Sequence, residues 1–446
     1  MSFELRKLWE HAGGQLPHDW EIAPLESFFR DAKSIAVGVM YPGPDTPGGT
    51  PLLKVGDIRD GAALRPSYCI SAATDEEHRR TKLIGDELLI TLVGNPGECV
   101  VVTPAMAGWN PARAIAVIRL QDTSLRTYLK TVLESTAGRH LIDAVLNTTV
   151  QKTLNLKDIR KLPIPLPTDE EIKWISGISE ALTTRITLLR ETNATLEAIT
   201  QALFKSWFVD FDPVRAKLEG RAPEGMDDAT AALFPDGFEE SELGLVPRGW
   251  RVLPIGDAVA AVGGATPDTK NPAYWEPAIH CWTTPKDLSG IAAPILLDTE
   301  RRLSDEGLAK IGSGALPIGT LLLSSRAPIG YIALAQVPLA INQGYIAMLP
   351  GGLLPPLYML FWCRQNMENI KGRANGSTFM EISKKAFRPI PALVPPPEIV
   401  QAFVDVAGVL FERLIENEKQ AQTLATLRDT LLPRLISGAL RLPEVT

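Results

Sequence analysis

Long apolar runs and paired cysteines are both missing from this 446-residue chain. No stretch approaches the roughly 20 consecutive apolar residues that a membrane span needs. The opening residues, MSFELRKLWEHAGG, carry charges where a secretory signal would be apolar. The four cysteines lie far apart and form no Cys-x-x-Cys pair, which argues against a zinc site and favours buried thiols in a reducing compartment. We therefore expect a cytoplasmic protein without a metal or a membrane span.

The usual sequence marks of an enzyme are also absent. The chain has no Gly-x4-Gly-Lys-Ser/Thr phosphate loop, and no glycine-rich turn followed about 20 positions later by an acidic residue. The stretch NPAYW at 271–275 is only partly similar to the amine-holding element of amino-methyltransferases, because Ala273 replaces the second proline. His78 stands among charges in TDEEHRRTK without a recognisable Ser or Cys nucleophile, so we interpret it as a solvated loop residue. These absences predict a chain that is not catalytic.

An excess of positive charge is missing from the chain as a whole, whose formal net charge is -7. Residues 210–242 hold ten acidic and three basic side chains, a balance equal to that of the whole chain, so the remainder is neutral. Two other stretches are locally basic: residues 364–388 have six Lys or Arg against two Glu, and residues 139–161 have five against two Asp. Either run alone could be a solvated face. Their matching places in the two halves favour a negatively charged ligand such as DNA.

An internal repeat organises the chain. PHDWEIAPLESF (17–28) matches PRGWRVLPIGDA (247–258), which places Trp20 and Trp250 at equivalent positions. GDELLITLVGNPGECVVV (85–102) corresponds to IGTLLLSSRAPIGYIALA (318–335), and each reads as two apolar strands joined by a turn. LPIPLP (162–167) and RPIPALVPPP (388–397) close the two copies. The repeat predicts two α/β units of the same kind.

A long helical pattern follows each copy, from about 168 to 208 and from about 397 to 439. Each helix would be around 60 Å long if unbroken. A narrow stripe in the first helix consists of Leu182, Ile186, Leu189, Asn193, Leu196, Ile199 and Leu203, and its counterpart 228 positions later consists of Leu410, Leu414, Asn417, Ala421, Leu424, Leu427 and Leu431. So narrow a stripe favours one partner helix. We predict an antiparallel, coiled-coil-like pair; the alternative is that each helix packs only on its own unit.

The predicted fold is α+β, with two repeated α/β domains separated by the two long antiparallel, coiled-coil-like helices. The predicted boundaries are 1–167 for the first domain including its N-terminal segment 1–16, 168–209 for the first spacer helix, 210–242 for an acidic linker, 243–396 for the second domain, and 397–446 for the second helix and tail.

Polar, glycine-rich loops between the apolar runs supply the candidate DNA-binding residues. Arg, Asn, Gln, Ser and Thr are the side chains that contact base edges, and Lys and Arg hold phosphates. The candidates are Asn110, Arg113, Thr148, Lys152, Arg326, Asn342, Gln343, Arg373, Ser377, Thr378, Lys384 and Lys385. Two loop-bearing units on a rigid spacer suggest that two separated places on one long ligand are read.

The exit of the first long helix, ALFKSWFVDFDPV (202–214), carries four aromatic residues. We expect Phe204, Trp207, Phe208 and Phe211 to form an exposed patch that binds a partner protein or the first unit of the chain. The matching exit of the second helix, LLPRLISGAL (431–440), is apolar but has no aromatic residue. The two helix ends are therefore expected to differ.

Three further motifs carry a family resemblance: GGATPDTKNPAYWEPAIHCWTTPKDL (263–288), LFPDGFEESELGLVPRGW (233–250) and LFKSWFVDFDPVRAK (203–217). They resemble the DNA-specificity (S) subunits of type I restriction-modification systems, and GGTPLLKVGDIRDG (48–61) resembles a more divergent form of the family's opening. The resemblance covers essentially the whole chain. It implies two target-recognition domains, each of which binds one half of a bipartite site in double-stranded DNA, held apart by two antiparallel helices.

The resemblance also implies that the chemistry resides in partner subunits. Modification subunits, expected in two copies, would methylate adenine with S-adenosylmethionine, and a restriction motor-nuclease subunit would use ATP and Mg. No cofactor is expected in this chain. Two alternatives remain open from the residues alone, a fused DNA methyltransferase or nuclease and a duplicated protein-binding scaffold. The bases that the loops read do not follow from the sequence.

Overall fold

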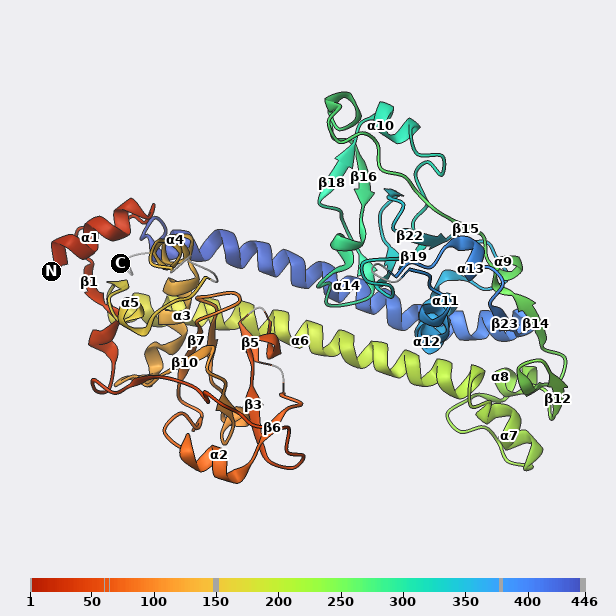
Figure 1. The fold of residues 1–446 in the computed structure, drawn as a ribbon, viewed down its shortest axis with the longest axis horizontal. Helices are drawn as coiled ribbons and strands as arrows, with labels where there is room; N and C mark the ends of the chain where they lie inside the picture. The colour runs from red at the N-terminus through yellow and green to blue at the C-terminus, as the bar shows by residue number, and fades with distance from the viewer. Residues whose placement is uncertain (1, 60, 64, 147–151, 377–379, 442–446) are drawn as a thin grey trace, which may run out of the picture. The chain divides into compact units, whose positions relative to one another are not determined.

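The computed structural model describes residues 2–59, 61–63, 65–146, 152–376 and 380–441. The chain divides into two compact units (Figure 1). Unit 1 comprises Met1–Ile186 together with Thr423–Thr446, and unit 2 comprises Thr187–Gln422.

Unit 1 is built around a four-stranded antiparallel sheet in the order β2-β10-β7-β8. The central strands β7, LLIT, and β10, IAVI, are largely apolar and are buried at every position. A second sheet has the order β6-β3-β9, and two pairs, β1-β11 and β4-β5, complete the unit. The elements are α1 (Ser2–His11), β1 (Glu21–Pro24), β2 (Ile35–Val37), β3 (Thr50–Leu53), β4 (Ile58–Arg59), β5 (Ala62–Ala63), β6 (Cys69–Ile70), α2 (Ala72–Glu77), β7 (Leu88–Thr91), β8 (Cys99–Val101), β9 (Asn110–Pro111), β10 (Ile115–Ile118), α3 (Arg126–Glu134), α4 (Thr136–Ala144), α5 (Leu156–Ile159) and β11 (Pro163–Leu166).

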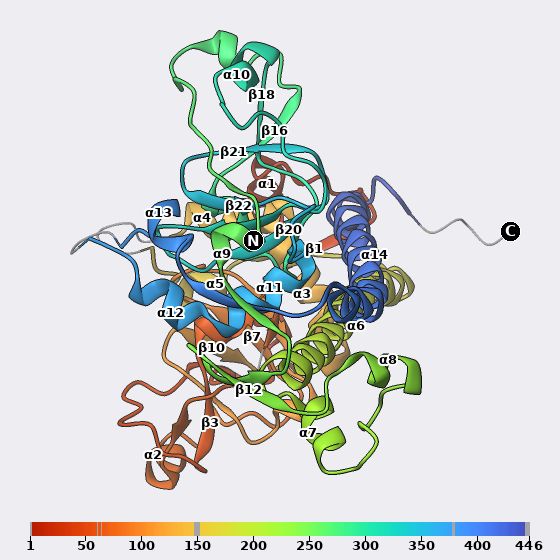
Figure 2. The same cartoon turned by 90° about the vertical axis from the view of Figure 1, so that its right-hand side faces the viewer.

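Unit 2 has a five-stranded sheet, β15-β22-β19-β20-β17, a three-stranded sheet, β18-β16-β21, and the pairs β14-β23 and β12-β13. Helix α11 packs against β19 and β20 of the larger sheet. Figure 2 shows α11 beside β20. The elements are α7 (Asp212–Leu218), α8 (Asp228–Leu233), β12 (Phe238–Ser241), β13 (Gly244–Pro247), β14 (Arg251–Pro254), α9 (Ile255–Ala258), β15 (Ala261–Val262), β16 (His280–Thr283), β17 (Ile295–Leu296), β18 (Arg301–Leu303), α10 (Asp305–Ala309), β19 (Leu321–Ser324), β20 (Ile332–Ala335), β21 (Leu339–Ile341), β22 (Tyr345–Met348), α11 (Pro356–Gln365), α12 (Met367–Gly372), α13 (Lys384–Phe387) and β23 (Pro391–Val394).

The internal repeat is visible in the strand pairing of the two units. In unit 1, β3 and β9 run parallel with Leu53 opposite Pro111; in unit 2, β16 and β21 run parallel with Thr283 opposite Ile341, 230 positions later for both residues. Likewise β1 pairs with β11 and β14 pairs with β23, so the strand after each matched tryptophan returns to the proline-rich end of its own unit. The two units therefore share one backbone plan despite different loops.

Two long helices, α6 (Asp169–Phe208) and α14 (Pro397–Ile436), each contribute residues to both units. The start of α6 is a capping box, because the Glu171 amide donates to the Thr168 hydroxyl (3.3 Å) and the Glu171 carboxylate accepts from the Thr168 amide (3.0 Å). Helix α14 begins at Pro397, whose missing N–H costs nothing at the first helical position. Both helices fall where the sequence predicts them.

The helix pair is antiparallel, as predicted, in each unit. In unit 2, Asn417 donates through Nδ2 to Oδ1 of Asn193 (2.9 Å), while Phe204, further along α6, contacts Phe403, which comes earlier in α14. In unit 1, Ile175 of α6 shares a core with Leu435 and Ile436 at the end of α14. Residues that come later in α6 therefore contact residues that come earlier in α14, which is the antiparallel arrangement.

Two members of the predicted stripe lie outside the seam. Ile199 is 51% exposed and its counterpart Leu427 is 47% exposed, whereas Thr200 is fully buried. The Thr200 hydroxyl satisfies its hydrogen-bonding need by donating to the Leu196 carbonyl one turn earlier (2.8 Å), which allows a polar side chain in the seam. The hydrophobic pattern therefore predicted Ile199 as the buried residue, whereas its neighbour Thr200 is the one that is buried.

The segment 210–242, expected to be an acidic linker, is a folded part of unit 2. It forms α7, α8 and β12, and Val214 and Phe234 are buried in the same core as Trp250. Its ten acidic side chains remain mostly outside that core. The charge pattern did not reveal the apolar residues spaced between the charges.

Candidate nucleic-acid interface

A tightly anchored polar turn joins β21 to β22 in unit 2. The amide of Asn342 donates to the Thr283 carbonyl (3.0 Å), and the side-chain carbonyl of Asn342 accepts from the Gly344 amide (2.8 Å). This Asx-type bond holds the turn and leaves Asn342 half-buried. Gln343, at the tip, is exposed. The structure gives Asn342 a turn-forming contact and leaves Gln343 accessible from solvent.

The loop after β15 lies against this turn. The amide of Ala265 donates to the Ile341 carbonyl (3.1 Å), and the Thr266 hydroxyl donates to Oε1 of Gln343 (2.6 Å). A Cβ added to Gly264 would lie 1.8 Å from the Ile341 oxygen, so the close approach of the loop requires glycine here.

Two more loops complete the group in unit 2. The Ser325 amide donates to the Gly344 carbonyl (2.8 Å), and the Ser325 carbonyl accepts from the Ile382 amide (3.0 Å). The loop between β19 and β20 is therefore joined to the turn on one side and to the segment before α13 on the other. Within this contact, Arg326 and Glu381 form an ion pair at 3.8 Å.

Basic side chains border the grouped loops. Lys384 and Lys385 open α13 and are both exposed, and a Cβ added to Gly263 would lie 3.1 Å from the Lys384 ammonium nitrogen. Arg373 is exposed at the end of α12, where it donates to the Asn369 side chain (3.2 Å). Exposed cations beside exposed hydrogen-bonding groups are the combination that nucleic acid requires. Of the remaining candidates, Ser377 and Thr378 lie outside the described residues.

Unit 1 repeats this arrangement with different side chains. The turn between β9 and β10 carries the exposed Arg113, whose amide donates to the Val39 carbonyl (2.9 Å). Lys152 is exposed and precedes Leu154, whose amide donates to the Leu92 carbonyl at the end of β7 (2.9 Å). Thr148 lies outside the described residues. Arg113 and Lys152 thus lie on loops that correspond to those of the unit 2 group.

The prediction that Asn110 is available to DNA is wrong, because Asn110 is fully buried. Its amide nitrogen donates to the Asp75 carboxylate (3.3 Å) and to the His78 carbonyl (3.2 Å), and its carbonyl accepts from the Thr81 hydroxyl (2.8 Å). Burial alone would raise the pKa of Asp75, but hydrogen bonds from Lys82 and Asn110 lower it below the ordinary value. Asn110 therefore stabilises a loop network within unit 1.

The prediction that the aromatic residues of the helix exit form an exposed patch is wrong. Phe204, Trp207 and Phe208 are 1%, 5% and 7% exposed and lie in the core of unit 2. Phe211 is half-buried in the left-handed backbone region (φ 56°), with its ring 5.8 Å from the Trp250 ring. The helix ends among aromatic side chains of its own unit, so these rings do not form an accessible docking surface. The aromatic motif does indicate a large apolar surface, but this surface belongs to the core of unit 2.

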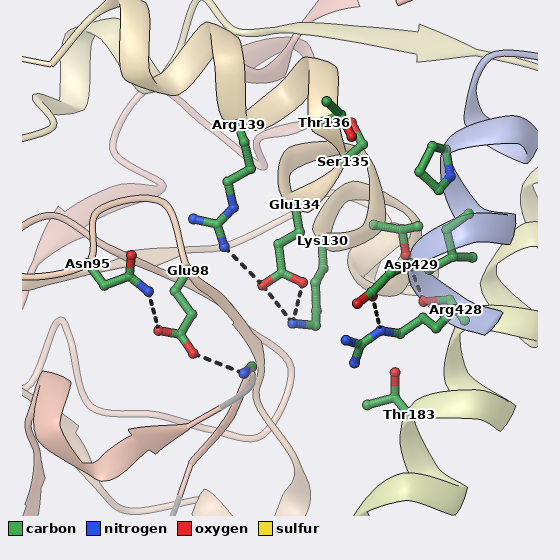
Figure 3. A pocket seen from close by; sticks show the side chains of 15 residues that line it. Asn95, Glu98, Lys130, Glu134, Ser135, Thr136, Arg139, Thr183, Arg428 and Asp429 are labelled. Atoms are coloured by element: carbon green, nitrogen blue, oxygen red, sulfur yellow. Dashed lines mark hydrogen bonds and ion pairs between the residues drawn. The ribbon is translucent and has the colours of Figure 1, made fainter. Parts of the chain in front are cut away.

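Unit 1 contains a polar cavity of about 360 Å³ next to α3 and the turn between β7 and β8 (Figure 3). Its three basic side chains each have an acidic neighbour: Lys130 lies 2.8 Å from Glu134, Arg139 lies 4.0 Å from Glu134, and Arg428 lies 2.8 Å from Asp429. Because these charges compensate each other, the cavity has little attraction for phosphate compared with the exposed loop cations.

Metal-ligating side chains are not clustered, and three of the four cysteines are buried, in the described part of the chain. No group of three or more His, Cys, Asp or Glu side chains in the described part of the chain could hold a metal ion. Burial raises the pKa of the Cys99 and Cys363 thiols above the ordinary value, which keeps them protonated and poorly nucleophilic. Cys281 is buried and Cys69 is half-buried, and all four cysteines are free thiols. None of the helices in the described part of the chain is long and apolar enough to span a bilayer.

Sequence reasoning missed Thr266 and Glu381. Thr266 lies in the motif at 263–288 that carries the family resemblance, and its contact with Gln343 joins residues 77 positions apart. Glu381 was counted only as a charge opposing the local basic run. The paired glycines before Thr266 were the available signal, since they indicate a close backbone approach.

Comparison with known families defines the class of this fold. Residues 247–426 match the family model described as the type I restriction modification DNA specificity domain. The solved structure of the type I restriction-modification system S subunit from M. genitalium has the same fold, with a TM-score of 0.54 at 16% identity over 97% of this chain and 99% of that one.

Curated relatives agree with this class. The chain is 37% identical over 185 residues to the type I restriction enzyme MjaIX specificity subunit of Methanocaldococcus jannaschii, a match that covers 41% of this chain and only 42% of that protein. It is 26% identical over 352 residues to the type I restriction enzyme HindI specificity subunit of Haemophilus influenzae, covering 70% of this chain and 74% of that protein. Over the matched stretches the chain is similar to the specificity subunits of type I restriction-modification systems.

Proposed function

We propose that this chain is the DNA sequence-recognition subunit of a type I restriction-modification complex. Units 1 and 2 each read one half of a bipartite target in double-stranded DNA. The chain docks modification subunits, in two copies, and a restriction motor-nuclease subunit, and it is not itself catalytic. S-adenosylmethionine, ATP and Mg act in those partner subunits. The observation that carries the proposal is the repeated turn at 111–115 and 341–345, which presents an exposed Arg113 in one unit and an exposed Gln343 in the other.

A binding experiment tests this proposal. The chain assembled with a modification subunit should bind duplex DNA in fluorescence anisotropy and select a sequence with two fixed halves. Absence of DNA binding in that assembly would favour a protein-binding scaffold instead. Methyl transfer by the chain alone, in the presence of S-adenosylmethionine, would favour a fused methyltransferase.

Lys384 and Lys385 are expected to contact phosphates. Each change to alanine should weaken binding to cognate and random duplexes alike, and should lower the slope of log K against log salt by about one unit, because one fewer counterion is released. Lys173→Ala, which removes an exposed lysine of α6, is the matched control and should leave the slope unchanged. A loss confined to the cognate duplex would assign the two lysines to base contacts instead.

We propose that α6 and α14 set the length of the non-specific DNA spacer, because each helix runs unbroken from one unit into the other. One heptad inserted after Ile186 and another after Gln422 should preserve the buried stripe with a drift of about 20°. Each helix grows by about 10.5 Å, which corresponds to about three base pairs at 3.4 Å each.

Methylated sites mapped after this double insertion should keep both half-site sequences but show a longer spacer, or activity should be lost if the DNA twist costs too much. A heptad placed in only one helix is the control, and it should disrupt the helix pair. Full activity at the original spacing after the double insertion would contradict the proposal.

A further inference from the structure

The turns that carry Arg113 and Gln343 occupy the same place in the two units. Both lie between a strand in parallel pairing and a central strand of the larger sheet, at positions 230 apart. Four backbone hydrogen bonds recur around them. In unit 1 they are Ala112 N to Leu53 O, Val39 N to Pro111 O, Leu92 N to Ala114 O and Leu154 N to Leu92 O, and in unit 2 they are Asn342 N to Thr283 O, Ala265 N to Ile341 O, Ser325 N to Gly344 O and Ile382 N to Ser325 O.

The backbone of both turns is held firmly while the tip side chain is exposed. A Cβ on Gly38 would lie 2.0 Å from the Pro111 oxygen, just as one on Gly264 would lie 1.8 Å from the Ile341 oxygen, so a neighbouring segment presses against each turn. Arg113 and Gln343 are both exposed at these tips. A rigid base below an accessible polar side chain is the arrangement that selective recognition needs, because little order must be imposed on binding.

The amide of Gln343 is oriented by its neighbour. The Thr266 hydroxyl donates to Oε1 of Gln343 at 2.6 Å. The amide oxygen has two lone pairs, and the amide nitrogen has two N–H groups, so one acceptor position and both donors stay available. A glutamine amide so presented matches adenine, whose major-groove edge offers the N6 donor and the N7 acceptor.

Arg113 offers different chemistry at the same place. Its guanidinium carries five donors and no acceptor, and therefore matches guanine, whose O6 and N7 are both acceptors. We infer that the two turns are matched base-reading positions: Gln343, positioned by Thr266, reads an adenine in one half-site, and Arg113 reads a guanine in the other. This inference rests on the proposed function and assigns base identity within it.

The test uses the chain assembled with its modification subunit and a set of duplexes in which each base pair of the target is changed in turn. Gln343→Ala should reduce discrimination about 5- to 150-fold at one A·T pair of one half-site, and Arg113→Ala should do so at one G·C pair of the other. Gln401→Ala and Arg185→Ala remove exposed side chains of the same types from the long helices and serve as controls with unchanged discrimination.

Thr266 needs a readout that separates positioning from general structure. Thr266→Val should reduce discrimination at the same A·T pair as Gln343→Ala, the double variant should lose no more than Gln343→Ala alone, and Thr266→Ser, which keeps the hydroxyl, should restore the preference. Losses that add, or that spread over many base pairs, would overturn the positioning role.

Other outcomes separate a wrong base assignment from a wrong proposed function. If Gln343→Ala or Arg113→Ala weakens all duplexes equally, or relaxes a pair of the other kind, the base assignment is wrong although the proposed function stands. If the unaltered assembly selects no sequence at all, the proposed function itself fails. Gln343→Arg should shift the preferred base at its position from adenine to guanine, and an unchanged preference for adenine would also overturn the assignment.

Discussion

If the proposed function holds, exchanging residues 17–167 for the corresponding segment of a type I specificity subunit with a different target should replace one half-site and leave the other half-site intact. All strands and loops of unit 1 that surround Arg113 lie within this segment, and both of its ends are joined in the β1-β11 pair. The segment thus begins and ends at one place, so a foreign copy can be accommodated without changing the course of the chain.

Sequencing of methylated adenines in a host that carries the exchanged chain provides the measurement. The reciprocal exchange of residues 247–396 is the matched control and should alter only the other half-site. Simultaneous change of both half-sites in either exchange would show that the two units do not read DNA independently.

Phe208→Ala is expected to destabilise the chain by about 3–5 kcal/mol, because a large buried aromatic side chain leaves a cavity that its neighbours fill only partly. The ring centre of Phe208 lies 4.9 Å from that of Tyr358 and 5.2 Å from that of Phe403, both in edge-on contacts. The loss should appear as a lower urea midpoint for the purified chain, with weaker assembly only as a consequence.

Phe3→Ala is the control for this change, because Phe3 is 65% exposed and its removal should shift the midpoint little. A Phe208→Ala chain of unchanged stability that nevertheless failed to bind a modification subunit would restore the interpretation of the aromatic helix exit as a docking surface.

The sequence predicted those parts of the structure that depend on repetition and periodicity. The apolar runs LLIT and LLLS became central buried strands, and the two long stripes became an antiparallel helix pair. Side-chain accessibility was predicted less well. Asn110 and Gln343 both appear in polar, glycine-rich loops, but Asn110 lies on a short strand that faces Asp75 and is fully buried, and that environment is created by residues distant in the sequence.

The aromatic helix exit is a second case in which the sequence did not predict side-chain accessibility. Phe204 and Trp207 indicate a large apolar surface, but the sequence alone does not say whether another chain or the same chain covers it. In the structure these rings contact Phe403, Tyr358 and Phe234 of the same chain. Phe403 is the most distant of the three in the sequence, 199 positions from Phe204. Local composition therefore indicated a large apolar surface but did not show that the same chain buries it.

The hydrogen-bonded amides of Asn193 and Asn417 penalise misalignment of the two long helices during folding. Sliding one helix by seven residues would preserve most apolar contacts but would set Asn193 beside Leu410 and Asn417 beside Ile186. Each stranded amide would then cost about 1–3 kcal/mol. Leucine pairs alone would tolerate such a slip, whereas this pair of hydrogen-bonded asparagines gives the correct alignment a clear advantage over its nearest competitor.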